Sequence, residues 1–223
     1  MKRSEVNAAI RNVMALAEKY SFRLPPFADW TPRQWQEKGP ECDEIRKAML
    51  GWDVTDFGSG DFEKVGLSLF TIRNGVYGSD QYSKPYAEKI LVSNENQYTP
   101  YHFHWNKQED IINRGGGNLM IQLYNSTPDE QMDTESAIQV SIDGVRQTLP
   151  AGDIVRLTPG ESICLTQGLY HQFWAEEGFG PVLVGEVSMT NDDKADNRFW
   201  KPGNRFSAIE EDEPALRLLC NEY

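Results

Sequence analysis

Residues 101–117 read YHFHWNKQEDIINRGGG, with two histidines one residue apart. On a β-strand the side chains at i and i+2 point to the same face, so His102 and His104 can share one metal ion. Glu109 follows a short polar segment and can bring a carboxylate to the same ion from a neighbouring strand. The chain has three histidines, and the third, His171, lies in a second strand-like stretch. Three imidazoles and one carboxylate form an N/O ligand set that suits a divalent transition metal and leaves room for water or substrate.

The spacing of these residues fits the pattern H-x-H-x4-E-x6-G, which ends at Gly116. This pattern resembles the first motif of the cupin superfamily, whose fold is a small antiparallel jelly-roll barrel with the metal inside. The segment from Gly168 to His171 resembles the second cupin motif, G-x2-H. It departs from that motif at Thr166, where proline is usual, and at Ala175, where asparagine is usual. These two departures change the turn expected around His171, but the histidine ligand itself is present.

The composition of the 223 residues is that of a globular chain, with 39% hydrophobic and 25% charged residues. The length predicts one domain with extensions. A net charge of −12 without a Lys/Arg cluster argues against nucleic acid as a partner. No apolar run approaches the ~20 residues that span a bilayer, so no membrane partner is expected.

The three cysteines, Cys42, Cys164 and Cys220, are widely spaced and form no C-x-x-C motif. This pattern predicts reduced thiols rather than a zinc finger or a redox site. The first residues lead into an amphipathic helix rather than a signal peptide. We therefore expect a cytoplasmic protein.

Helical signals are confined to the first fifty residues. Apolar residues at helical spacing predict a helix over residues 4–20, with Ser4 as its N-cap. The segment Thr31-Pro32-Arg33-Gln34 is a helix start with a capping box. A third short helix is expected over residues 41–49. These helices are too few to bury a core of their own, so we expect residues 1–50 to form an extension that packs on a barrel.

From about residue 52 the hydrophobic period changes to that of strands. The strand-like stretches are 65–72, 86–92, 98–105, 109–113, 118–124, 137–142, 147–149, 154–157, 162–166, 170–175 and 182–188. Many short strands separated by turn signals indicate a sandwich or barrel. We expect a mainly β fold, a cupin-type antiparallel jelly-roll barrel over residues 51–190, with residues 191–223 as a C-terminal segment of the same domain.

Glycines at 115–117 could suggest a phosphate-binding loop. No lysine and no helical pattern follow them, so we interpret this run as a hairpin turn.

Four segments together resemble the D-lyxose isomerase family: RSEVNAAI, LPPFADWTP, YHFHWNKQEDIINRGGG and GEVSMTNDDKADNRF. The resemblance spans residues 3–206. It implies a manganese-dependent aldose–ketose isomerase that acts on D-lyxose and D-xylulose, and on D-mannose and D-fructose. Carried over position by position, the metal ligands are His102, His104, Glu109 and His171. Ligand type alone leaves Zn²⁺, Co²⁺, Ni²⁺ and Fe²⁺ as alternatives to Mn²⁺.

An aldose–ketose isomerase moves a proton between C1 and C2, so the site needs an acid–base group. Lys107 and Asp110 flank the ligand Glu109, and Glu186 is a carboxylate in an apolar strand; these three are the catalytic candidates. Lys89 lies between apolar neighbours in a strand, which marks a pocket residue. Arg205 is a second candidate for substrate binding, or a partner for nearby aspartates.

Two other functions stay open from the residues alone. A three-His, one-Glu site also serves metal-dependent oxidoreductases of the dioxygenase type, and a non-catalytic sugar-binding cupin would show the same ligands. The charged candidates around the site favour a polyhydroxylated substrate, and the acidic chain favours free sugars over sugar phosphates. Tyr101, Phe103 and Trp105 alternate with the histidines and would form an outward aromatic row. Because such a row needs a cover, we expect a homodimer.

Overall fold

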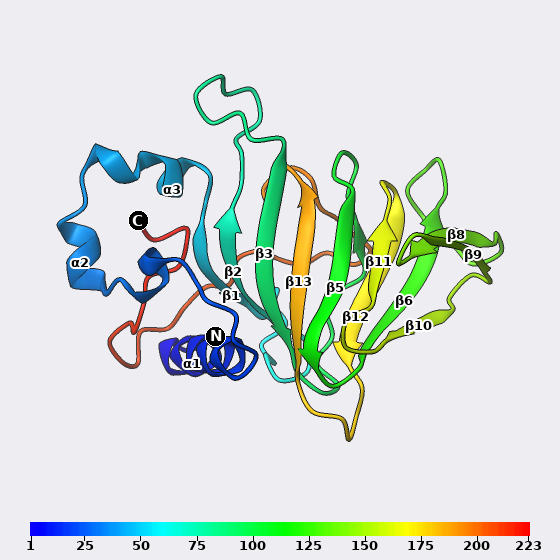
Figure 1. The fold of residues 1–223 in the computed structure, drawn as a ribbon, viewed down its shortest axis with the longest axis horizontal. Coiled ribbons are helices and arrows are strands. Elements are labelled where there is room, and N and C mark those ends of the chain that lie inside the picture. The colour runs from blue at the N-terminus through cyan, green and yellow to red at the C-terminus, as the bar shows by residue number, and fades with distance from the viewer.

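Two curled antiparallel sheets form the body of the computed structural model, which describes residues 1–223 (Figure 1). The eight-stranded sheet has the order β1 (Gly51–Thr55), β2 (Leu67–Arg73), β3 (Tyr86–Ser93), β13 (Val182–Met189), β5 (Glu109–Gly116), β11 (Ser162–Leu165), β8 (Ile138–Ile142) and β9 (Val145–Leu149). The six-stranded sheet has the order β10 (Ile154–Leu157), β6 (Leu119–Ser126), β12 (Leu169–Ala175), β4 (His102–Phe103) and β14 (Arg198–Phe199), with β7 (Met132–Asp133) paired to β6. The predicted mainly β, cupin-type architecture is confirmed.

The core between the sheets follows from alternation along the strands. On β5 the side chains of Glu109, Ile111 and Asn113 are buried, whereas Asp110 and Arg114 are exposed. Inward residues of both sheets form one apolar cluster, which includes Leu69, Leu91, Leu119, Ile121, Leu123, Leu165 and Phe173. Because the period of a strand is two, the same alternation that builds this core also places Glu109 inside the barrel.

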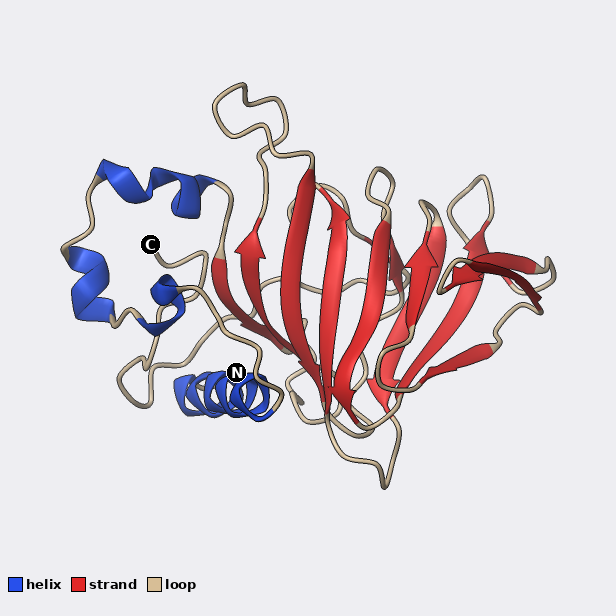
Figure 2. Cartoon of the chain, viewed as in Figure 1, coloured by secondary structure: helices blue, strands red, loops and turns tan.

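The helical segments gather at one end of the molecule, beside β1 (Figure 2). They are α1 (Arg3–Lys19), α2 (Pro32–Gln36), α3 (Asp43–Lys47) and the 3-10 turns η1 (Pro26–Asp29) and η2 (Pro40–Cys42). Helix α1 lays Ile10 and Val13 against the outer face of the eight-stranded sheet, in one buried cluster with Phe70 and Leu183. No helix combines the length and the apolarity that crossing a bilayer requires.

The helix starts were predicted with mixed success. The capping box at Thr31 is present: Gln34 N donates to Thr31 Oγ1, and Thr31 N donates to the Gln34 side chain. Ser4 is not the N-cap of α1. The cap is Lys2, whose N–H donates to Glu5, while Ser4 hydrogen-bonds with Asp212 of the C-terminal segment. The Ser4 hydroxyl thus bonds a residue more than two hundred positions away instead of capping the helix.

The glycine run at 115–117 does not make a hairpin. Strands β5 and β6 flank it but belong to different sheets, so the chain crosses from one sheet to the other at this point. Gly116 has φ +110°, and a Cβ there would lie 2.2 Å from the carbonyl oxygen of Pro181. Glycine is therefore required for a close backbone approach, not for a tight two-strand turn.

The aromatic row beside the histidines is covered partly by this chain itself. Phe103 is buried against Tyr170, at a ring distance of 4.8 Å, and Trp200 packs edge-on against Tyr170. Trp105 is 42% exposed, and its indole N–H donates to Glu130. The cover comes from the C-terminal segment and the loop at residue 130, whereas the helices lie against the other sheet.

Candidate metal centre and active site

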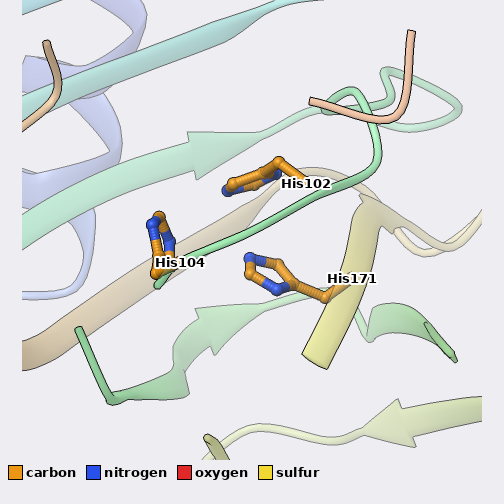
Figure 3. A group of neighbouring side chains, drawn as sticks. All are labelled: His102, His104 and His171. Atoms are coloured by element: carbon orange, nitrogen blue, oxygen red, sulfur yellow. The ribbon is translucent and has the colours of Figure 1, made fainter. Parts of the chain in front are cut away.

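The three histidines meet inside the barrel (Figure 3). His102 lies on β4 and pairs in register with His171 on β12, and His104 follows just after β4. One ligand nitrogen from each histidine lies within 4.8 Å of the other two. The predicted convergence of His102, His104 and His171 is therefore present, although β4 is only two residues long where a strand over 98–105 was expected.

Each histidine is oriented by a bond from its Nδ1 to a backbone carbonyl. The acceptors are Pro100 O for His102 (2.9 Å), Asp196 O for His104 (2.6 Å) and Leu169 O for His171 (3.0 Å). A carbonyl oxygen only accepts, so each Nδ1 carries the proton and each Nε2 presents a lone pair. His104 Nε2 is buried without a hydrogen-bond partner. An orphaned buried nitrogen with this orientation fits a metal ligand.

Glu109 supplies the carboxylate of the set. Its Oε1 lies 3.2 Å from His171 Nε2 and 3.5 Å from His104 Nε2, and its Oε2 lies 2.6 Å from Lys107 Nζ. Burial would raise the pKa of Glu109, but the ammonium of Lys107 and the neighbouring His104 outweigh burial and hold the pKa well below its usual range. Glu109 is thus an anion that faces the imidazole nitrogens.

His102 and His104 are held in their neutral form. Burial lowers the pKa of His102 well below its usual value, and His171 and His104 lower it further. Burial also lowers the pKa of His104, with the ammonium of Lys107 as the second cause. Neutral imidazoles are the form that ligates a metal, so these residues fit a divalent ion together with Glu109.

Two buried lysines share one carboxylate beside the triad. Lys107 Nζ donates to Glu186 Oε1 at 2.9 Å, and Lys89 Nζ donates to the same oxygen at 3.0 Å. Asn191 Oδ1 accepts from Lys89 at 2.9 Å and from Lys107 at 3.1 Å. Burial would lower the pKa of Lys107, but Glu109 and Glu186 outweigh burial and raise the pKa above its usual value. Lys107 thus uses its three N–H groups on Glu109, Glu186 and Asn191, whereas Lys89 has two such partners and keeps one N–H beside the cavity.

Arg205 lies on the same cavity and is fixed by two aspartates. It donates to Asp53 at 2.6 Å and lies 3.2 Å from Asp193. Its Nη1 is buried without a partner. Arg205 therefore combines the two roles that its position in the sequence left open, because it pairs with an aspartate and still offers donors to a ligand.

Asp110 is not part of this site. It is exposed on the outer face of β5, paired in register with Cys164, while its neighbour Glu109 points inward. Adjacent side chains on a strand point to opposite faces, so a residue next to an inward ligand cannot reach the same cavity. The structure thus brings eight of the nine predicted site residues together; His102, His104, His171, Glu109, Lys89, Lys107, Glu186 and Arg205 all line one cavity.

The family model "D-lyxose isomerase" matches residues 1–223. The chain belongs to the D-lyxose isomerase family. It is 53% identical over 224 aligned residues to the D-lyxose/D-mannose isomerase of Serratia proteamaculans, and 53% identical to that of Escherichia coli O157:H7. Each alignment covers 100% of this chain and 98% of the relative.

Solved structures show a shared fold at lower identity. The L-ribose isomerase of Cellulomonas parahominis superposes with a TM-score of 0.61 at 17% identity, over 94% of this chain and 98% of that one. The L-ribose isomerase of Geodermatophilus obscurus gives a TM-score of 0.62 at 17% identity, with the same coverage. These likenesses place the barrel and its helical extension in a known sugar-isomerase architecture.

Several residues of the site escaped the sequence analysis. Asp196 was not named as a site residue, yet it is buried and accepts from the N–H groups of Asn106 and Lys107 at 2.9 Å each. Asn191 and Phe199, also from the stretch after β13, were not singled out. The signal that could have found them is the segment GEVSMTNDDKADNRF, which already carried part of the family resemblance.

We predict that Asp196→Ala weakens metal binding about 10- to 100-fold, as is typical when the groups that orient ligands are lost. The change removes the acceptor of the Asn106 N–H and of the buried Lys107 N–H, and it loosens the turn that holds His104 and Lys107. Metal titration against a fluorescent chelator measures the effect. Asp196→Asn keeps one acceptor oxygen and should lose less; equal affinity of both variants and the wild type would contradict this role.

Proposed function

We propose that this chain is a metal-dependent aldose–ketose isomerase that interconverts D-lyxose and D-xylulose, and also D-mannose and D-fructose. The observation that carries the proposal is the histidine triad with Glu109, which lies beside the buried Lys89–Lys107–Glu186 cluster in one cavity. The names of the relatives from Serratia and Escherichia support the choice of sugars.

His102, His104, His171 and Glu109 would hold the metal, with Mn²⁺ as the expected ion. When bound, the ion would act as a Lewis acid toward the sugar oxygens. The site could also take Zn²⁺, Co²⁺, Ni²⁺ or Fe²⁺, because N/O ligands alone do not choose among these ions.

Glu186 is the group best placed to move the proton between C1 and C2 through an enediol. Its Oε1 accepts from Lys89 and Lys107, which fixes the carboxylate, and Glu186 lines the cavity beside the histidines. Lys89 would donate its remaining N–H to a sugar oxygen, and the positive charge of Lys107 would stabilise negative charge as it develops there. Arg205 would contact the sugar through its unpartnered Nη1, which orients the substrate.

A cupin oxidoreductase and a non-catalytic sugar binder are the competing functions. The cavity is lined by charged groups that suit hydroxyls, and the family is one of sugar isomerases. Both points favour isomerisation over oxidation of an aromatic substrate. A non-catalytic sugar-binding protein would not need an acid–base carboxylate placed beside two lysines.

We predict that chelation abolishes isomerisation of D-lyxose and that Mn²⁺ restores it. A panel of free pentoses and hexoses, followed by product chromatography, should show turnover of D-lyxose and D-mannose. Free sugars should be preferred over their phosphates, because each basic group near the metal is already paired with a carboxylate. Oxygen consumption with a phenolic substrate, or binding without turnover, would contradict the proposal.

We predict that Glu186→Gln lowers kcat by about 10²–10⁴-fold, the range for loss of a general acid–base group. Deuterium from solvent should enter C1 of the ketose with the wild type and not with the variant, as read by mass spectrometry. Asp110→Asn is the matched control, since it neutralises a carboxylate outside the cavity and should leave kcat unchanged. Equal loss in both variants would remove Glu186 from proton transfer.

We further propose a homodimer that acts in the cytoplasm. Tyr86, Val187 and Met189 are between 42% and 46% exposed and lie on the outer face of β3 and β13. Such a patch favours cover by a second copy, and three free cysteines fit a reducing compartment. Light scattering should give twice the 25.4 kDa of one chain. A monomer mass for the metal-loaded protein would contradict the dimer.

A further inference from the structure

Two cavities lie on either side of one wall. The inner cavity, of about 40 Å³, contains the histidine triad, Glu109 and Glu186. The outer cavity, of about 670 Å³, lies between the turn at Gly58 and residues 200–204 of the C-terminal segment. Phe57 and Thr99 line both cavities, so they form the wall between them.

The inner cavity is much the narrower of the two, with about 40 Å³ open to water against about 670 Å³ in the outer cavity. For a sugar with C1 and C2 at the histidines and Glu186, the larger open space lies past the wall. The open space on the far side is the outer cavity, so the end of the sugar remote from C1 points there.

Phe57 holds this wall in a strained conformation. Its φ is +54°, a left-handed value that is an outlier for a bulky residue. The conformation is kept by hydrogen bonds: Phe57 N donates to Thr55 Oγ1 at 2.9 Å, and Asn204 N donates to Phe57 O at 3.0 Å. Strain that the surroundings maintain in this way is typical of functional positions.

Phe199 completes the wall from the other side. Its ring lies 5.9 Å from that of Phe57, edge to face, and 5.6 Å from that of His102. The two phenyl rings thus bridge the distance from a metal-ligand histidine to the outer cavity. The rings present apolar surface where the path to the histidines narrows.

We propose that Phe57 and Phe199 form an aromatic gate that sets the relative use of six-carbon and five-carbon sugars. The inference rests on the proposed isomerase function. D-mannose is D-lyxose with one further CH₂OH group at the end remote from C1. That group has to be accommodated at the gate, whereas the reacting atoms of both sugars meet the same residues.

The test is the ratio of kcat/KM for D-mannose to that for D-lyxose in Phe57→Leu and Phe199→Leu. Each change removes ring volume but keeps an apolar side chain, and leucine at 57 carries the same backbone constraint as phenylalanine. We expect the ratio to rise about 10-fold or more in either variant, the effect of about one methylene in a fitted pocket. Bound metal and thermal unfolding are measured on the same samples.

Two controls separate the gate from general damage. Phe179→Leu removes an exposed aromatic ring that lines neither cavity and should leave the ratio unchanged. Phe57→Tyr and Phe199→Tyr retain the ring and should keep or lower the ratio. A ratio within two-fold of the wild type in both leucine variants, at full metal content, overturns the gate. A wild type that isomerises neither sugar overturns the proposed function instead.

Discussion

Glu109 is a buried carboxylate, and the need to neutralise it shapes the whole site. One of its oxygens faces the nitrogens of His104 and His171, and the other lies 2.6 Å from the ammonium of Lys107. Burying an unpaired charge is very costly, so Lys107 must stay charged and must have partners of its own. Glu186 meets that need and brings in Lys89 as the second cation. The result is a connected cluster of two lysines and two glutamates inside an apolar barrel, next to a histidine triad that could hold a metal ion.

The C-terminal segment completes this cluster from outside the barrel. Asn191 accepts from both lysines, and Asp196 fixes the turn between His104 and Lys107 with its side chain while its carbonyl orients His104. The same segment continues through β14 to Arg205, so one stretch of chain provides polar partners, an aromatic wall and a cation to the cavity. Bonds of this kind position the groups that contact metal or substrate, and they make the segment a functional part of the site rather than a tail.

Sequence-based predictions succeeded where they depended on residues close together in the chain, and they failed where a distant residue decided the contact. The capping box at Thr31 depends on two residues three positions apart, and it formed as predicted. The cap proposed at Ser4 failed because Asp212, distant in sequence, competes for its hydroxyl. The glycine run was placed correctly as a break between strands. Its role as a hairpin was wrong, because the sheet that each flanking strand joins is decided by non-local pairing.

The sequence by itself determined the class of fold and pointed to the residues that meet around the histidine triad. The i, i+2 histidines, the spacing to Glu109 and the alternation of apolar residues are short-range patterns, and a strand period of two turns them directly into faces of a sheet. Only the tertiary structure decided which charges meet. It placed Glu109 on the inner face and Asp110 on the outer face of one strand, and it brought the carbonyl of Asp196 to His104, 92 residues away in the chain. It also set Phe57 against Phe199 at the mouth of the inner cavity. These contacts join segments that lie far apart in the chain, and no local spacing records which of them meet.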